Sequence, residues 1–269
     1  MANVRTEWTT YGEFSGYLAQ PEETAAGPRP AVLVIQEIWG VDPHIQDVTR
    51  RFAAAGYTAF APDLYARNGK RPEALEAERV EAVKRFRDAL PPAVPGGPDV
   101  QEQTLAALPA DEAERLRETL GAIFNGDRSA LAEPVYAAAQ WLRREDGPAA
   151  PRTAAVGFCL GGMLAAQLAC RDPQLAGAVV FYGGAPAAEE IPGIACPVLG
   201  FYGELDRRIT DAVPAFAEAM KEHGKRFDYV VYDGAPHAFF NDTRPSYREE
   251  PSQDAFRRTL EFLRERLGQ

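Results

Sequence analysis

The chain has 269 residues, of which 46% are hydrophobic and 25% are charged, a composition typical of globular proteins rather than disordered or fibrous ones. Its 39 acidic side chains outnumber the 29 basic ones and give a net charge of −10, and no Lys/Arg run resembles a phosphate-binding stripe, so nucleic acid is not an expected partner. Residues 1–20 are polar and no apolar stretch approaches the roughly 20 residues of a membrane span. We therefore expect a cytoplasmic protein with no membrane partner.

The first predicted elements alternate between strand and helix. Residues 3–19 alternate polar and apolar side chains, which indicates an antiparallel hairpin. The wholly apolar run 31–35 is typical of a strand buried on both faces of a parallel sheet. A helix is predicted at 45–55, and residues 57–62 follow it as the next strand. Strand, helix, strand is the repeating unit of an α/β fold.

The segment from about 66 to 134 departs from this alternation. Charged amphipathic helices are predicted at 72–90 and 103–124, separated by the Pro- and Gly-rich stretch 91–98. Two interpretations are open: the helices form a lid over a site, or they pack on the rim of the fold. A further helix at 135–144 leads back to the sheet.

The second half of the chain resumes the alternation. Strands are predicted at 152–156, 178–182, 198–202 and 227–232. Helices are predicted between or after them, at 163–170, 212–223 and 253–267. Because neither an internal repeat nor an interdomain linker is evident, we predict one α/β domain over residues 1–269, with a mostly parallel sheet of seven or eight strands.

A sharp turn between a predicted strand and a predicted helix carries the sequence G-x-C-x-G-G, with Cys159 at its centre. Flanking glycines let a strand and a helix pass closely, and the side chain at the apex then projects at the amino end of the helix. Backbone N–H groups and the helix dipole favour negative charge there, so a thiol ionises more readily. Cys159 is the predicted nucleophile, and the alternative is a buried structural cysteine.

The other two cysteines, Cys170 and Cys196, bring the total to an odd number. An odd number does not indicate a disulfide framework, and the spacing fits no zinc ligand set. We therefore expect reduced thiols and no metal site. Cys170 and Cys196 are interpreted as small buried hydrophobic residues.

A thiol nucleophile needs a base, and the chain holds three histidines. His223 ends a predicted helix and His44 begins one, positions typical of the surface. His237 lies in a loop just past a predicted strand. Because α/β proteins place their chemistry at the carboxyl ends of parallel strands, His237 is the predicted base.

The orienting acid lies between nucleophile and histidine if the fold is an α/β-hydrolase. The chain leaves a predicted strand through Gly203 and reaches Asp206, with Glu204 as a competitor two residues earlier. We prefer Asp206 because the turn begun at Gly203 gives the chain room to reverse toward the site. The separations of 47 residues from Cys159 to Asp206 and 31 from there to His237 each leave room for a strand and a helix.

An oxyanion hole needs two backbone N–H donors aimed where charge develops. The residue after the nucleophile, Leu160, supplies one candidate, and Ile38, in the loop after the strand at 31–35, supplies the other. The neighbouring Glu37 is a carboxylate directly after a buried apolar run, which is costly unless it is exposed or paired. It forms an ion pair at the rim or lies beside the thiol.

Five motifs in one order resemble the dienelactone hydrolase family, also called carboxymethylenebutenolidases. They are QEIWG at 36–40, APDLY at 61–65, GFCLGG at 157–162, GELD at 203–206 and PHAF at 236–239. The resemblance extends from about residue 10 to the end of the chain and is weakest at 66–134. It implies an α/β-hydrolase fold and a Cys-His-Asp triad that opens a lactone or cleaves an ester through an acyl-enzyme, with no cofactor.

The resemblance also implies roles for Glu37 and for arginines. In the family pattern Glu37 contacts the resting thiol and moves away when substrate binds, which agrees with the rule that a nearby carboxylate disfavours the thiolate. The family binds the substrate carboxylate with arginines, one of them four residues after the histidine, where this chain has Asn241. Arg244 lies three residues later and is a candidate replacement. We therefore expect an ester or lactone other than dienelactone itself.

The second family arginine falls in the poorly matched helical segment, where Arg67, Arg71 and Arg79 are all candidates. Three aromatic residues near the motifs, Trp39, Tyr65 and Phe239, are candidates for lining an apolar substrate pocket. Phe158 and Tyr202 are interpreted as core residues.

The predicted partner is a small ester or lactone, and the predicted assembly is a monomer or a small homo-oligomer. Two other functions use the same features: a redox-responsive thiol protein that reacts through Cys159, and a binding scaffold that retains the site without catalysis.

Overall fold

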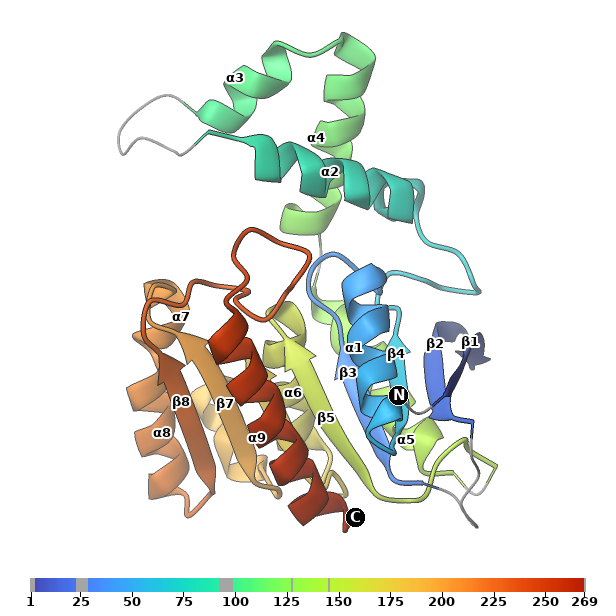
Figure 1. The fold of residues 1–269 in the computed structure, drawn as a ribbon, viewed down its shortest axis with the longest axis vertical. Coiled ribbons are helices and arrows are strands. Elements are labelled where there is room, and N and C mark those ends of the chain that lie inside the picture. The colour runs from blue at the N-terminus through green and yellow to red at the C-terminus, as the bar shows by residue number, and fades with distance from the viewer. Residues whose placement is uncertain (1–2, 23–28, 92–98, 127, 145, 269) are drawn as a thin grey trace.

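The computed structural model describes residues 3–22, 29–91, 99–126, 128–144 and 146–268. Its centre is an eight-stranded sheet with the strand order β1-β2-β4-β3-β5-β6-β7-β8 (Figure 1). The strands are β1 (Val4–Tyr11), β2 (Phe14–Pro21), β3 (Ala31–Ile35), β4 (Thr58–Pro62), β5 (Thr153–Phe158), β6 (Ala178–Phe181), β7 (Val198–Gly203) and β8 (Phe227–Tyr232).

The sheet is mostly parallel, as predicted. The opening hairpin β1–β2 is antiparallel and β2 pairs antiparallel with β4, whereas β3 to β8 pair parallel. All five residues of β3 and all six of β5 are buried, which explains their continuous apolar sequence. The α/β-hydrolase class and the number of strands are confirmed.

Helices cover both faces of this sheet. Those that pack on it are α1 (Pro43–Ala54), α5 (Ala132–Leu142), α6 (Leu160–Arg171), α8 (Val213–Glu222) and α9 (Glu249–Leu267). Residues of α1 and α9 share one hydrophobic core with the sheet, and residues of α5, α6 and α8 share the other. A short helix, α7 (Arg207–Thr210), follows β7, and the 3₁₀ turns η2 (Ser129–Leu131) and η3 (Ala188–Gly193) lie in connections.

A helical segment stands over the carboxyl ends of the strands (Figure 1). It consists of the 3₁₀ turn η1 (Glu73–Leu75) and the helices α2 (Ala77–Ala89), α3 (Val100–Ala106) and α4 (Ala110–Asn125). The buried residues that hold it together come from all of these elements and from one residue of the sheet loops: Trp39, Leu75, Val80, Val83, Leu105, Leu116, Leu120 and Ile123.

The structure corrects the predicted helices of this segment. The helix predicted at 103–124 is two helices, because Pro109 stands at the N-cap of α4 and disfavours helical backbone at the residue before it. The helix predicted at 72–90 begins with the turn η1 and becomes α-helical only at Ala77. Most of the predicted separator, residues 92–98, lies outside the described residues. Within the part of the chain that the structure describes, no helix has the length and apolarity needed to cross a bilayer.

Candidate active site

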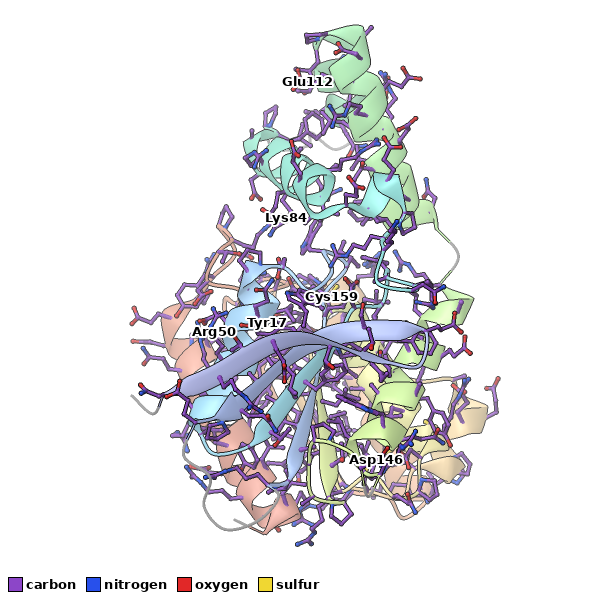
Figure 2. The ribbon with its side chains drawn as sticks, turned by 90° about the vertical axis from the view of Figure 1, so that its right-hand side faces the viewer. Tyr17, Arg50, Lys84, Glu112, Asp146 and Cys159 are labelled. Atoms are coloured by element: carbon purple, nitrogen blue, oxygen red, sulfur yellow. The ribbon has the colours of Figure 1, made fainter. Side chains whose placement is uncertain are left out.

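Cys159 lies at the turn between β5 and α6 with φ 53° and ψ −113°, a conformation that non-glycine residues rarely adopt. The turn is sharp because glycines let backbone segments touch. A Cβ atom on Gly157 would lie 1.9 Å from the carbonyl oxygen of Gly161, and one on Gly161 would lie 2.2 Å from that of Ile35. Figure 2 shows Cys159 at the end of the sheet that faces the helical segment. The predicted strand, turn and helix are therefore present, with the sulfur projecting from the apex.

Asp206 and His237 meet at the same edge of the sheet. Asp206 follows β7 and His237 lies in the loop after β8, and the His237 Nδ1 to Asp206 Oδ2 distance is 2.5 Å. Glu204, the alternative candidate for the orienting acid, has another partner: its Oε2 accepts a hydrogen bond from the Gly234 N–H at 2.8 Å. The structure therefore pairs Asp206, rather than Glu204, with the histidine.

His237 also interacts with Cys159. Burial by itself would lower the pKa of His237, but hydrogen bonds with Asp206 and Cys159 outweigh it and raise that pKa to about 10. The raised pKa favours the protonated imidazole, which has a carboxylate on one side and the sulfur on the other. A protonated imidazole beside a sulfur is the arrangement that stabilises a thiolate nucleophile.

The two candidate oxyanion donors lie on neighbouring loops. Leu160 is the first residue of α6, where backbone N–H groups have no partner within the helix. In the loop after β3, the carbonyl of Glu37 accepts a hydrogen bond from the Gly40 N–H at 3.4 Å. Because a trans peptide points its C=O and N–H in opposite directions, the Ile38 N–H faces away from that turn.

Glu37 is 2% exposed, and both of its carboxylate oxygens accept hydrogen bonds. Tyr182 Oη donates to Oε1 at 3.1 Å and Asn241 Nδ2 donates to Oε2 at 2.7 Å. Asn241 is fully buried, and its Oδ1 accepts from the backbone N–H and the hydroxyl of Thr243. The residue in the arginine position of the family pattern therefore anchors Glu37.

Sequence reasoning missed Tyr182 at this site. It ends the strand predicted at 178–182, and its φ of 40° turns it out of the strand direction. Its ring contacts that of His237, with 5.1 Å between the centroids. The sequence does contain a signal for this residue, since Tyr182 ends a predicted buried strand and two glycines follow it.

The predicted substrate residues have different surroundings. Trp39 is 7% exposed and packs in the core of the helical segment, and Arg244 lies 5.0 Å over its ring and forms an ion pair with Asp88 at 2.8 Å. Phe239 is fully buried against Tyr182. Both aromatic rings thus lie in hydrophobic cores.

Tyr65 borders a cavity of about 400 Å³. It lies between the end of α4 and the sheet with its covering helices, which we call the sheet domain. The apolar part of its wall includes Leu64, Tyr65, Leu75, Ile123, Leu131 and Leu160. Arg67 and Arg128 are its charged wall residues. Because Leu160 follows Cys159, this cavity lies near the Cys159 turn, although neither Cys159 nor His237 is among its wall residues. A cavity of about 510 Å³ between α2 and α4 is lined by Arg79, one of the three arginine candidates, and by none of the predicted catalytic residues.

The remaining arginine candidates are engaged elsewhere. Arg71 Nε donates to Asp63 at 2.6 Å, and the side chain of Arg79 is buried with a hydrogen bond to Glu118 at 2.7 Å.

The predicted surface position of His44 is wrong, because the residue is 1% exposed. It packs edge-on against Phe158 and Phe240, and its Nδ1 lies 3.3 Å from Asp242. The amino end of α1 abuts the sheet, which buries this ring. By contrast, His223 is exposed at the end of α8.

Comparison with known proteins identifies the family. The profile of the dienelactone hydrolase family matches residues 14–267. The chain belongs to the dienelactone hydrolase family. A "Putative carboxymethylenebutenolidase" of Saccharolobus solfataricus is 35% identical over 92% of both chains, and one of Methylorubrum extorquens is 33% identical over 94% of this chain and 77% of its own.

Solved structures agree with this assignment. A "Putative Dienelactone Hydrolase" of Klebsiella pneumoniae is 29% identical, covers 97% of this chain and 98% of its own, and has a TM-score of 0.69. Membership of the dienelactone hydrolase family makes this protein an ester or lactone hydrolase that acts on a small molecule.

Proposed function

We propose that the protein hydrolyses a carboxylic ester or lactone through an acyl-enzyme on Cys159, with His237 as acid and base and Asp206 as the orienting group. The main support is the His237 ring, which bonds Asp206 at 2.5 Å and interacts with Cys159 at a strained turn. Three side chains from distant parts of the chain converge as nucleophilic catalysis requires.

The reaction proceeds in two steps. The Cys159 sulfur attacks the carbonyl carbon, and the resulting oxyanion accepts hydrogen bonds from the N–H groups of Ile38 and Leu160. The carbon–oxygen bond to the alkoxide breaks, and the alkoxide takes the proton of the His237 imidazolium. In the second step His237 removes a proton from water, the hydroxide attacks the thioester, and the sulfur leaves as a thiolate.

The substrate binds with its apolar part in the cavity beside Leu160. Its wall includes Ile123 of the helical segment and the guanidinium groups of Arg67 and Arg128. We propose that the helical segment forms a wall of the binding site rather than an addition to the rim. Because Asn241 anchors Glu37 and Arg244 is paired with Asp88, the substrate is an ester or lactone other than dienelactone itself.

Turnover of p-nitrophenyl acetate tests the mechanism. We expect hydrolysis by the parent protein and a loss of at least about a thousand-fold in kcat for Cys159→Ala and for His237→Ala. Cys170→Ala is the matched control, because Cys170 lies near the far end of α6, about 16 Å along the helix from Cys159.

Cys170 is the thiol on α6 that could form a disulfide with an oxidised Cys159. Its distance of about 16 Å along the helix is too long for a disulfide, which disfavours a redox function. Stoichiometric labelling of Cys159 without turnover would contradict hydrolysis and favour the redox-thiol or scaffold function. Turnover that survives Cys159→Ala would contradict the acyl-enzyme.

We further propose that Glu37 restrains the thiol. The buried Glu37 carboxylate bonds Tyr182, which has both Glu37 and Cys159 as electrostatic neighbours, and a carboxylate near a sulfur disfavours the thiolate. In the substrate-free protein, Glu37→Gln should then speed the alkylation of Cys159 by iodoacetamide. An unchanged or slower rate would remove this role.

A further inference from the structure

The loop that supplies the Ile38 N–H is tied to the loop after β4. The backbone N–H of Leu64 donates to the buried Gln36 Oε1 at 3.1 Å. The hydroxyl of Tyr65 donates to the backbone carbonyl of Ile38 at 2.8 Å. The second bond reaches Ile38, whose N–H is the candidate oxyanion donor, so the loop after β4 contacts the candidate oxyanion hole directly.

Tyr65 is itself held in place. Its backbone N–H donates to Asp63 Oδ1 at 3.1 Å, and Asp63 Oδ2 accepts from Arg71 Nε at 2.6 Å. The Arg71 guanidinium packs against Gly40, where a Cβ atom would lie 2.7 Å from its nearest nitrogen. Burial raises the pKa of Tyr65 to about 12, so its hydroxyl keeps its proton and remains a donor.

The side chains of this loop are held by other contacts, Glu37 by Tyr182 and Asn241 and Trp39 by the core of the helical segment, but the turn that contains Ile38 is closed by a weak backbone bond. The hydrogen bond from the Gly40 N–H to the Glu37 carbonyl is long, at 3.4 Å. The N–H and the C=O of Ile38 belong to adjacent peptide planes that meet at one Cα atom. A bond that fixes the C=O therefore restrains the direction of the N–H, and small errors in the placement of an oxyanion donor are costly.

We propose that Tyr65 is a positioning residue for the oxyanion hole: by holding the carbonyl of Ile38, its hydroxyl keeps the Ile38 N–H directed at the oxyanion that forms when Cys159 attacks. This inference rests on the proposed acyl-enzyme mechanism. It assigns the hydroxyl a role separate from that of the Tyr65 ring, which lines the adjoining cavity.

The test is Tyr65→Phe, which removes the hydroxyl and retains the ring. With p-nitrophenyl acetate we expect kcat to fall about 10- to 100-fold while KM stays within about two-fold, because the lost interaction acts in the transition state. Alkylation of Cys159 by iodoacetamide should keep its rate, since displacement of iodide generates no oxyanion at a carbonyl.

Tyr11→Phe is the matched control. Tyr11 is also a buried tyrosine whose hydroxyl donates to a backbone carbonyl, that of Pro134, at 3.1 Å. We expect its kcat and alkylation rate to match those of the parent. Agreement of the control with a selective fall in kcat for Tyr65→Phe supports the inference.

Two results would overturn the positioning role while leaving the mechanism intact: an unchanged kcat for Tyr65→Phe, or a parallel fall of kcat and alkylation rate, which indicates general disruption of the site. A parent protein that is alkylated but does not turn over the ester would overturn the acyl-enzyme mechanism and this inference with it.

Discussion

The carboxyl edge of the sheet and the helical segment above it are stabilised in different ways. At the sheet edge, backbone atoms approach so closely that Gly157 and Gly161 leave no room for a Cβ atom. The helical segment is held by a small side-chain core and by ion pairs to the sheet domain, such as that of Lys84 with Asp42. The edge therefore tolerates no added atom, whereas the segment depends on individual side-chain contacts.

The largest expected effect comes from adding one methyl group at the sheet edge. In Gly161→Ala the new Cβ would lie 2.2 Å from the Ile35 carbonyl oxygen, and backbone cannot move aside easily. We expect a loss of about 4 kcal/mol or more in the free energy of unfolding, measured by urea denaturation.

The substitution to compare with Gly161→Ala is Gly121→Ala in the helical segment. Gly121 is inside α4, and a Cβ atom there would have no neighbour within 4 Å. Gly121→Ala should stabilise the protein by about 0.5–1 kcal/mol, because alanine favours helix. Similar effects of the two substitutions would break the contrast between the regions.

An intermediate effect is expected where the segment meets the sheet domain. Lys84 of α2 bonds Asp42 at 2.8 Å, with side chains 8% and 4% exposed, and Asp42 also caps α1 through the Ile45 N–H. Figure 2 shows Lys84 at the underside of the segment. Lys84→Met leaves a buried carboxylate without its cation and should cost about 3 kcal/mol in the free energy of unfolding.

The control for Lys84→Met is Arg117→Met. Arg117 pairs with Glu102 inside the segment, where the two side chains are 43% and 57% exposed. Its loss should cost far less than the loss of Lys84 because solvent screens the pair. Equal losses for both variants, measured by urea denaturation, would show that the Lys84–Asp42 contact is no stronger than a surface pair.

The smallest effect is a pH dependence at the sheet edge. The pKa of His237 rises from 6.5 to about 10 on folding, so its contribution to stability is complete below about pH 6.5 and is lost as the pH rises through about 10. The free-energy difference between the parent and His237→Gln should therefore shrink from pH 6 to pH 10.

We expect the change in this free-energy difference to be small, because the His237 side chain is 37% exposed and solvent screens its interactions. Urea denaturation at several pH values measures it. A difference that stays constant over this range would contradict the raised pKa.

Much of the fold and of the candidate site follows from local patterns. Runs of apolar residues such as 31–35 identify buried strands, because only a strand covered on both faces is apolar throughout. The turn with Cys159 and the loops with Asp206 and His237 can be located because each directly follows a predicted strand. The meeting of Asp206 and His237 follows because parallel strands end at one edge.

Other features could not be read from spacing. The break between α3 and α4 is caused by one residue, Pro109. The amphipathic pattern of 103–124 continues across this residue, so the pattern does not show the break. His44 is buried because α1 meets the sheet end, although its own neighbours in sequence resemble a surface turn.

The sequence alone determined the order of the strands and of the helices that cover the sheet, the cysteine turn and the family, since each depends on residues that are close along the chain. The tertiary structure decided that Asn241 binds Glu37 across 204 positions, that Arg244 pairs with Asp88, and that Tyr65 holds the carbonyl of Ile38. Such contacts depend on how loops from different strands pack at one edge, which no local pattern specifies.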